Sequence, residues 1–332
     1  MLNICLFGAG RIGKLHAGNI AANPRTQLTC VVDVVTEAAR SLADAYGAAT
    51  APDAASAFKA HDIDAVLIAS STNTHVDLMI AAADAGKAIL CEKPIDLDIG
   101  RVDTCVAQLA KSGVPAGIGF NRRFDPTMRA CRDAIRAGDV GAIEQVIITS
   151  RDPGPPPLSY IAVSGGIFRD MTIHDFDLAR WLLDDEPVEV FATGSSLVDP
   201  EIGKAGDFDS AMVIMRTAKG RLCHINNSRR ATYGYDQRIE IFGAKGMVRN
   251  DNHRPAAMLR SNATETEAQP PLLDFFLERY RDAYVNELND FVDAVEAGRQ
   301  PSVTVEDGRR ALLLADAAWE SARSGAWAKV PD

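Results

Sequence analysis

The first 33 residues contain the feature that most restricts the fold. A short apolar run, Leu2–Phe7, leads directly into the glycine-rich sequence GAGRIG at Gly8–Gly13, and a helical pattern follows. Gly8 permits a tight turn, Gly10 lets the backbone approach a pyrophosphate, and Gly13 lets helix and strand pack closely. This order of strand, turn and helix predicts a dinucleotide site with the phosphates at the helix N-terminus. The turn residues expected to contact the cofactor are Gly8, Gly10, Arg11, Ile12 and Gly13.

A carboxylate stands where such a site needs one. The second apolar strand, Leu28–Val32, ends in Asp33, about 20 residues beyond the glycines. A carboxylate there accepts hydrogen bonds from the adenosine ribose and repels a 2′-phosphate, so NAD is favoured over NADP. The alternative is that Asp33 is only a strand-end residue.

The alternation of strands and helices continues to Phe120. Ala65–Ala69, Ala88–Cys91 and Ala116–Phe120 are apolar runs typical of buried parallel strands, and Ile99–Ser112 has the pattern of a helix. Residues 1–120 are therefore predicted to form a doubly wound α/β domain that binds NAD, with its ligand at the carboxyl ends of the strands. Two polar segments follow such strand ends. They supply the remaining expected cofactor contacts, namely Ser70, Ser71, Thr72, Asn73, His75, Glu92 and Lys93.

Residues 121–332 are predicted to form a second domain of the α+β class, with a largely antiparallel, open-faced sheet. Short strands are separated by turns such as the Ala-Lys-Gly sequences at 218–220 and 244–246. Leu273–Ala297 and Val305–Ser324 are each expected to be one long helix, and Asp251–Pro271 a surface excursion. The strands are expected at Ile143–Ser150, Val188–Leu197, Ser210–Thr217, Leu222–Asn227, Gln237–Phe242 and Met247–Arg249.

One stretch of this second half combines helical periodicity with chemically active side chains. Gly165–Trp181 carries Asp170 and His174 four residues apart, which places them on one face of the predicted helix. A carboxylate beside an imidazole orients the ring and stabilises its protonated form, so the imidazole can act as a general base. The alternative is an aspartate that caps the helix and a histidine that is merely solvated.

Composition excludes several classes of protein. The chain has 332 residues, 47% of them hydrophobic, and a formal net charge of −10, which argues against nucleic acid or an anionic membrane as the main partner. No apolar run is long enough for a membrane span, and the first residues lack the layout of a signal peptide. The six cysteines form no CxxC pair or metal-like cluster. We therefore expect a cytoplasmic protein with reduced thiols.

Together these motifs resemble the family of glucose–fructose oxidoreductase, inositol dehydrogenase and rhizopine catabolism proteins. The residues that carry the resemblance are GAGRIG, Asp33, SSTNTH at Ser70–His75, EKP at Glu92–Pro94, GFNRRFDP at Gly119–Pro126, and the stretch with Asp170 and His174. Within the family, the inositol dehydrogenases are most similar, on the basis of SRDPGPPP at Ser150–Pro157, the run that starts at Gly165, and YGYDQR at Tyr233–Arg238.

The resemblance implies NAD-dependent oxidation of a cyclic polyol, with myo-inositol to scyllo-inosose as the favoured reaction. Lys93, Asp170 and His174 match the family's catalytic positions. His174 is expected to be the base, Lys93 to hydrogen-bond the reacting hydroxyl or relay its proton, and Asp170 to bind a neighbouring hydroxyl or orient His174. The further expected substrate contacts are Asn121, Arg122, Asp152, Thr172 and Tyr235. Arg122 and Asp152 could instead form an ion pair, and Tyr233 could replace Tyr235.

Several alternatives accompany this interpretation. Enzymatic alternatives are scyllo-inositol, D-chiro-inositol or an aldose, and the non-enzymatic one is an NAD- or sugar-sensing protein on the same fold. A sensor has no need for Lys93, Asp170 and His174 together. No metal is expected, because no second histidine has ligand spacing near Asp170, His174 and Asp177. The family also implies a homo-oligomer, a dimer or tetramer, assembled through the open face of the second sheet.

Overall fold

The computed structural model describes residues 1–331, which form two compact units. Unit 1 comprises Met1–Phe124 together with Asp282–Leu312, and unit 2 comprises Asp125–Arg281 and the chain from Leu313 onward. The chain thus returns to unit 1 after completing most of unit 2. The sequence-based boundary after residue 120 does not include this return.

Unit 1 is built on a six-stranded parallel sheet with strand order β3-β2-β1-β4-β5-β6. The order reverses between β1 and β4, so a crevice is expected at the carboxyl ends of these two strands. The predicted doubly wound α/β fold is confirmed. The strands are β1 (Leu2–Phe7), β2 (Thr26–Val32), β3 (Ala49–Thr50), β4 (Ala65–Ile68), β5 (Ala88–Glu92) and β6 (Ala116–Gly119).

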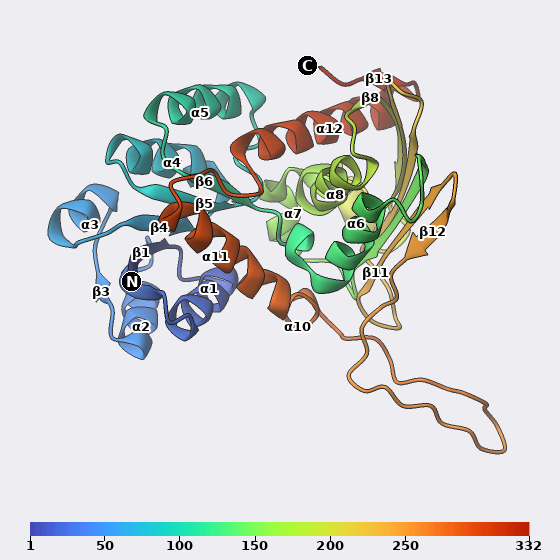
Figure 1. The fold of residues 1–332 in the computed structure, drawn as a ribbon, viewed down its shortest axis with the longest axis horizontal. Helices are drawn as coiled ribbons and strands as arrows, with labels where there is room; N and C mark the ends of the chain where they lie inside the picture. The colour runs from blue at the N-terminus through green and yellow to red at the C-terminus, as the bar shows by residue number, and fades with distance from the viewer. Residues whose placement is uncertain (332) are drawn as a thin grey trace. The chain divides into compact units, whose positions relative to one another are not determined.

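Helices cover both faces of this sheet (Figure 1). Helices α1 (Arg11–Ala22), α2 (Thr36–Tyr46) and α11 (Arg281–Glu296) lie on one face, and α4 (His75–Asp84) and α5 (Ile99–Ser112) on the other. Leu288, Phe291 and Val292 of α11 join the buried cluster that contains residues of β1 and α1. The return of the chain to unit 1 therefore completes its core. Three shorter helical segments are α3 (Ala54–Ala60), η1 (Thr72–Thr74) and η2 (Asn121–Phe124).

Unit 2 contains a seven-stranded sheet with order β12-β11-β7-β10-β9-β8-β13. Strands β7 and β10 pair in parallel, and every other pair is antiparallel, so the sheet is mixed but largely antiparallel as predicted. The strands are β7 (Ile143–Arg151), β8 (Pro187–Ser195), β9 (Ser210–Thr217), β10 (Leu222–Ser228), β11 (Asp236–Gly243), β12 (Gly246–Arg249) and β13 (Ala328–Lys329).

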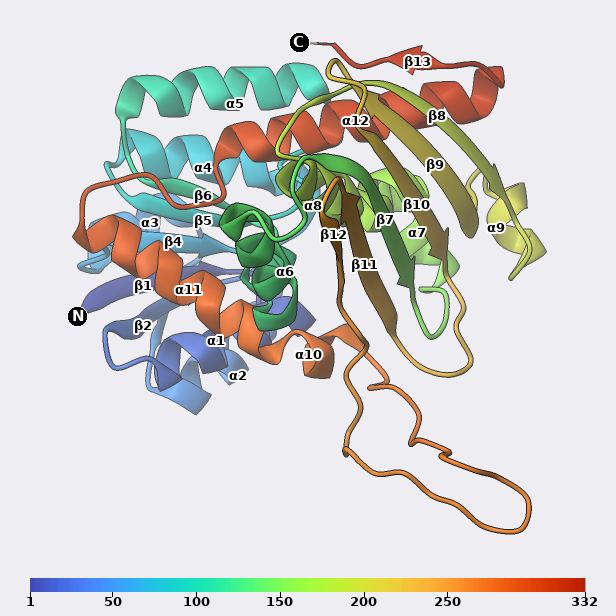
Figure 2. The ribbon, with the colours of Figure 1, turned by 45° about the vertical axis from the view of Figure 1, so that its right-hand side comes forward.

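Helices pack on one face of the second sheet and leave the other open (Figure 2). Along β9, Val213 and Met215 are buried while Met212 and Ile214 are exposed, the alternation of a sheet with one covered face. The helical segments of unit 2 are α6 (Pro126–Ala137), α7 (Leu158–Ser164), η3 (Phe168–Thr172), α8 (Ile173–Leu183), α9 (Pro200–Lys204), α10 (Phe276–Arg279) and most of α12 (Val305–Ser324).

The prediction of one helix over Leu273–Ala297 was wrong. The structure has a short helix, α10, which ends at Arg279, and a second helix, α11, which begins at Arg281. Side chains at the junction point inward: Arg279 pairs with buried Asp125, and Tyr280 donates a hydrogen bond to Gln237. These buried polar contacts fix the residues at which α10 ends.

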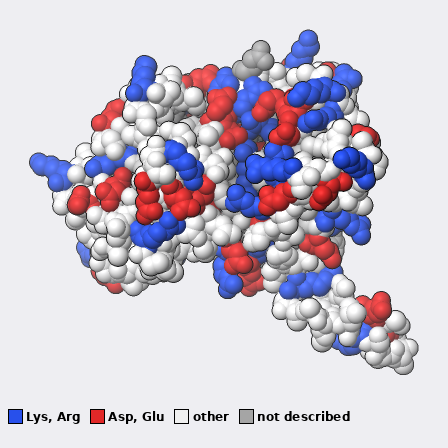
Figure 3. Space-filling model, in the orientation of Figure 1, with Lys and Arg blue, Asp and Glu red and all other residues white. Residues whose placement is uncertain are grey.

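The predicted surface excursion is present. Residues 251–271 form a long exposed arm beyond β12 (Figures 1 and 2). Within this arm, Arg260 and Ala268 pair in an isolated antiparallel β-bridge. On the face drawn in Figure 3, basic and acidic side chains are interspersed. Among residues 1–331, no helix is long and apolar enough to cross a membrane.

Candidate active site

The glycines of the first turn have the geometry that a dinucleotide requires. Gly8 has φ +100°, and a Cβ there would lie 2.5 Å from the Ala69 carbonyl oxygen. A Cβ on Gly13 would lie 1.9 Å from the Gly8 carbonyl oxygen. Helix α1 can therefore pack this closely against the turn after β1 only because residue 13 has no side chain. At Gly10 a Cβ would meet no atom within 4 Å, which leaves space over the turn. Gly10 has no side chain to cap α1, and the first N–H groups of the helix can serve a phosphate.

Asp33 is fixed beside this turn by the backbone. Its Oδ2 accepts a hydrogen bond from Ala9 N at 2.6 Å, and its Oδ1 accepts one from Val35 N at 2.8 Å. Each carboxylate oxygen can accept more than one hydrogen bond, so acceptor capacity remains for ribose hydroxyls. Asp33 therefore orders the glycine turn as well as standing at the end of β2.

His75 connects the two polar segments that follow β4 and β5. Its Nδ1 lies 2.8 Å from the Pro94 carbonyl oxygen, and its Nε2 lies 3.1 Å from the Ser70 carbonyl oxygen. Burial lowers the pKa of His75, and a neutral ring has one N–H, which the shorter distance assigns to Nδ1. The ring is 1% exposed. This buried position favours a structural role for His75, in which the ring holds the Ser70 and Pro94 segments together, over direct contact with a cofactor.

Lys93 follows the carboxyl end of β5 and is half-buried. The peptide bond between Lys93 and Pro94 is cis. Asn121 and Arg122 lie in η2, just beyond β6, and both are buried. The elements β5 and β6 are neighbours in the sheet, so these residues belong to the same edge of unit 1.

In unit 2, Asp170 and His174 lie where a π-helical turn meets an α-helix. The predicted helix over 165–181 begins as the π turn η3, which contains Asp170, and continues as α8, which contains His174. Single π-helical turns are rare and occur frequently at functional sites. Both side chains are half-buried, whereas most of α8 is fully buried.

Two side chains that sequence reasoning missed hold the Asp170 carboxylate. The Tyr160 hydroxyl donates to Asp170 Oδ1 at 2.9 Å, and Arg229 Nη1 donates to Oδ2 at 3.2 Å. Arg229 is 1% exposed and also lies 3.9 Å from a carboxylate oxygen of Asp207. The guanidinium thus stands between two carboxylates, and its charge-assisted hydrogen bond holds the Asp170 carboxylate in one orientation.

Asp207 in turn anchors the start of the π turn. Its Oδ1 accepts a hydrogen bond from Ile167 N at 2.9 Å. Gly166 has φ +84°, and a Cβ there would lie 2.8 Å from the same Oδ1. Burial raises the pKa of Asp207, while the Ile167 N–H and the charge of Arg229 oppose that rise. The second glycine of the pair at 165–166 is therefore what lets this carboxylate approach the backbone.

Not every predicted substrate contact is placed to make one. Thr172 is fully buried, and its hydroxyl donates to Asn227 Oδ1 at 2.7 Å, so the structure argues for a structural role. Tyr235 is 6% exposed and packs edge-on against the Tyr280 ring. Tyr233 is the exposed alternative, with its hydroxyl bonded to Asp236 and Arg151. Asp152 is half-buried at the end of β7.

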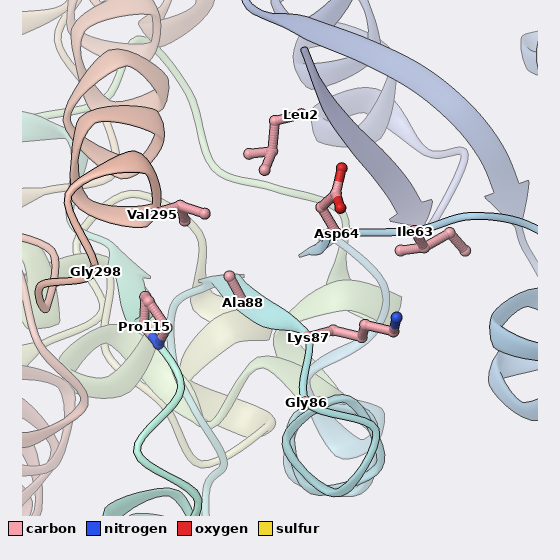
Figure 4. A pocket seen from close by; sticks show the side chains of 9 residues that line it. All are labelled: Leu2, Ile63, Asp64, Gly86, Lys87, Ala88, Pro115, Val295 and Gly298. Carbon is pink, nitrogen blue, oxygen red and sulfur yellow. The ribbon is translucent and has the colours of Figure 1, made fainter.

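A cavity of about 380 Å³ in unit 1 lies at the wrong edge for this chemistry. Figure 4 shows its lining, which includes Leu2, Asp64 and Ala88 at or just before the starts of β1, β4 and β5. Ligands of open α/β sheets bind at the carboxyl ends of the strands, which is the opposite edge. The cavity is therefore not part of the candidate active site.

The fold and the first unit's turn define a dinucleotide-dependent oxidoreductase. The cradle at Gly8–Gly13, the reversal of strand order and the carboxylate of Asp33 fit NAD. The chain belongs to the GFO/IDH/MocA family. Residues 2–120 match the oxidoreductase family with an NAD-binding Rossmann fold, and residues 128–249 match the GFO/IDH/MocA C-terminal domain.

The similarity to known proteins extends over the whole chain. An inositol 2-dehydrogenase of Rhizobium meliloti is 52% identical over 317 residues, 95% of each chain. The crystal structure of a myo-inositol dehydrogenase from Corynebacterium glutamicum is 47% identical, with a TM-score of 0.96 over 100% of this chain and 99% of that one. A myo-inositol dehydrogenase from Lactobacillus casei, crystallised with NAD(H) and myo-inositol, is 26% identical, with a TM-score of 0.90 over 100% and 97% of the two chains.

Proposed function

We propose that this oxidoreductase uses NAD to oxidise one hydroxyl of a cyclic polyol to a ketone, and that its main reaction converts myo-inositol to scyllo-inosose. The observation that carries this proposal is the chain-long identity to inositol dehydrogenases together with Lys93, Asp170 and His174 in one sequence. Scyllo-inositol, D-chiro-inositol and aldoses are the competing substrates, because the same chemistry serves each of them.

The residues of unit 1 bind the cofactor. The N–H groups at the start of α1 receive the pyrophosphate, and Asp33 accepts hydrogen bonds from the adenosine ribose. Ser70, Ser71, Thr72, Asn73, Glu92 and Lys93 complete the expected contacts along the carboxyl edge of the sheet. When bound, NAD supplies the hydride acceptor.

Three side chains handle the hydroxyl proton. His174 takes the proton as general base, and Lys93 hydrogen-bonds the reacting oxygen, which favours its alkoxide character. Asp170, held in place by Arg229, either accepts a hydrogen bond from a neighbouring hydroxyl or orients His174. The loss of the proton and the loss of the hydride together turn the alcohol into a ketone.

Specificity for a polyol comes from polar side chains that form hydrogen bonds with the substrate hydroxyls. A substrate that lacks one of these hydroxyls leaves a buried polar group unpaired, which costs binding free energy. Asn121, Arg122 and Asp152 are the proposed contacts, and Tyr233 replaces Tyr235 as the aromatic candidate because Tyr233 is exposed whereas Tyr235 is buried.

We further propose a cytoplasmic homo-oligomer, a dimer or tetramer, that assembles through the open face of the unit 2 sheet. Ile147, Met212, Ile214, Phe242 and Met247 are each more than a third exposed along that sheet. An apolar surface of this kind is typical of a subunit interface. Light scattering on the purified protein should give a multiple of the chain mass, and a monomer would reject the interface.

The function is tested by following NADH formation with myo-, scyllo- and D-chiro-inositol, glucose and xylose, each with NAD and with NADP. The proposal expects myo-inositol with NAD to give the highest kcat/KM. A different leading polyol would keep the chemistry but reassign the contacts at Asn121 and Asp152. Tight NADH binding without turnover of any polyol would instead support a sensor.

A further inference from the structure

Unit 1 contains a buried cluster of titratable groups that the proposed chemistry does not use. His16 on α1, Glu92 at the end of β5 and Glu287 on α11 each bring one nitrogen or oxygen atom within 4.8 Å of the others. His16 is 1% exposed and Glu287 is 2% exposed. His16 Nε2 lies 2.8 Å from Glu92 Oε1, a direct hydrogen bond. The cluster joins the dinucleotide-binding helix, the strand before Lys93 and the helix with which the chain returns to unit 1.

Glu287 is the unexplained member of this cluster. Both of its carboxyl oxygens are buried, and neither accepts a hydrogen bond from any described residue. An ionised carboxylate without a donor is strongly disfavoured in such a place. Burial, reinforced by the negative charges of Glu92 and Asp290, raises the pKa of Glu287 well above its usual value.

A neutral carboxylic acid resolves this arrangement, because its O–H is a donor. The carboxylate of Glu92 is an acceptor within the cluster, and the second ring nitrogen of His16, Nδ1, is buried without a hydrogen-bond partner among residues 1–331. The groups that face Glu287 are His16 from α1 and Glu92 from β5, with Asp290 on its own helix. Tyr284, also on α11, packs edge-on against the His16 ring at 5.6 Å.

We propose that Glu287 is a neutral buried acid and that, with His16, it is a positioning residue for Lys93. The two side chains hold the Glu92 carboxylate between α1 and α11, and Glu92 directly precedes Lys93 in the chain. The role of Lys93 in this inference rests on the proposed function, whereas the neutral state of Glu287 does not.

A divalent cation is the competing occupant of an imidazole and two carboxylates. The geometry favours the acid. Nε2 of His16 and Oε1 of Glu92 are 2.8 Å apart, the distance of a direct hydrogen bond between them, whereas two ligands about 2.1 Å from a tetrahedral zinc ion lie about 3.4 Å apart.

The neutral state is tested by the pH dependence of stability, without any assay of activity. A carboxyl group whose pKa is raised in the folded protein stays neutral there at pH values where it ionises in the unfolded chain. The free energy of unfolding therefore falls as pH rises from the unfolded pKa toward the folded pKa. Glu287→Gln keeps the neutral shape and removes this loss. The Tm of Glu287→Gln should therefore rise relative to that of the wild type by roughly 2 °C for each pH unit above about pH 5.

Glu296→Gln is the matched control, since it makes the same chemical change at an exposed position of α11. Its Tm should stay parallel to that of the wild type. Parallel curves for Glu287→Gln as well would overturn the neutral acid. So would one equivalent of Zn²⁺ or Mn²⁺ that raises the Tm of the wild type but not of Glu287→Gln.

The positioning role is tested by comparing Glu287→Gln with Glu287→Leu, which has similar size but no donor. Leucine should lower kcat about tenfold and change KM for NAD less than about threefold, whereas glutamine should restore most of kcat. Equal kcat values for the two variants would reject the positioning role. If the leucine variant fails to fold, Glu92→Gln is compared with the wild type instead. An unaltered kcat of Glu92→Gln would also reject the positioning role.

The two proposals fail in different ways. If the wild type oxidises no polyol, the proposed function fails, yet the Tm curves still decide the state of Glu287. If the wild type turns over but the Tm curves are parallel, the function stands and the neutral acid does not.

Discussion

Arg229 illustrates how a residue outside every sequence motif can fix the position of a residue inside one. Its guanidinium lies between Asp170 and Asp207 and is almost fully buried. Replacing Arg229 with methionine leaves two facing carboxylates without their cation, so the variant should lose about 3–5 kcal/mol of stability. It should also lower kcat, because Asp170 is no longer held in one orientation.

Urea denaturation and steady-state kinetics measure both effects. Arg230→Met is the natural control, because Arg230 is adjacent in sequence but exposed. Equal losses in the two variants would mean that the buried pairing is unimportant.

Lys93 is the residue on which the proposed chemistry depends most. Lys93→Ala should lower turnover about 10²–10⁴-fold, the usual contribution of a positioned acid or base, while NADH binding is retained. Stopped-flow kinetics and NADH fluorescence separate the two readouts. Lys87→Ala, just before the opposite end of strand β5, should change neither. Near-normal turnover of Lys93→Ala would remove this lysine from the mechanism.

Local sequence predicted the residues of the first unit better than the partners in the second. Gly8, Gly10 and Asp33 form a motif of fixed spacing, so their roles follow from a short stretch of sequence. Arg229 reaches Asp170 across 59 residues, and no spacing rule connects them. Buried pairs of this kind depend on how strands and helices pack, which a single sequence does not display.

At the scale of elements, the π turn before α8 depends on the glycine that precedes it. Gly166→Ala puts a Cβ into a left-handed conformation and against the Asp207 carboxylate. Gly138 has nearly the same φ, +83°, but a Cβ there meets no atom within 4 Å. Gly138→Ala should therefore cost only the backbone strain, about 1–2 kcal/mol.

Gly166→Ala should cost more than this control and should also lower kcat, because the displaced Asp207 anchors the turn that carries Asp170. Thermal unfolding and kinetics of the two variants give the comparison. Similar destabilisation with intact kcat in both would show that the close approach of Asp207 is not needed.

Elements with strong end signals were predicted well. Helix α5 has the predicted bounds, because Asp98 caps its first turn and Gly113 ends it in the left-handed conformation. Helix α7 was missed, since it has no side-chain cap and follows a proline-rich loop. The parallel pairing of β7 with β10 was also missed, because it joins strands that are distant in sequence.

At the scale of the whole molecule, the residues of the proposed reaction come from both units. Unit 1 contains the NAD-binding turn and Lys93, and unit 2 contains Asp170 and His174. Family membership and fold follow from the sequence because the motifs occur in order along the chain. The choice among cyclic polyols depends on a few side chains that differ by single hydrogen bonds, so sequence alone leaves it open.

The most direct test of the central claim follows the hydride itself. Myo-inositol that carries deuterium on the carbon bearing the oxidised hydroxyl should transfer that deuterium to the nicotinamide, detected in the reduced cofactor by mass spectrometry. We predict one deuterium in each NADH formed and a slower reaction than with unlabelled myo-inositol. NADH without deuterium, or no reduction of NAD by myo-inositol, would contradict the account.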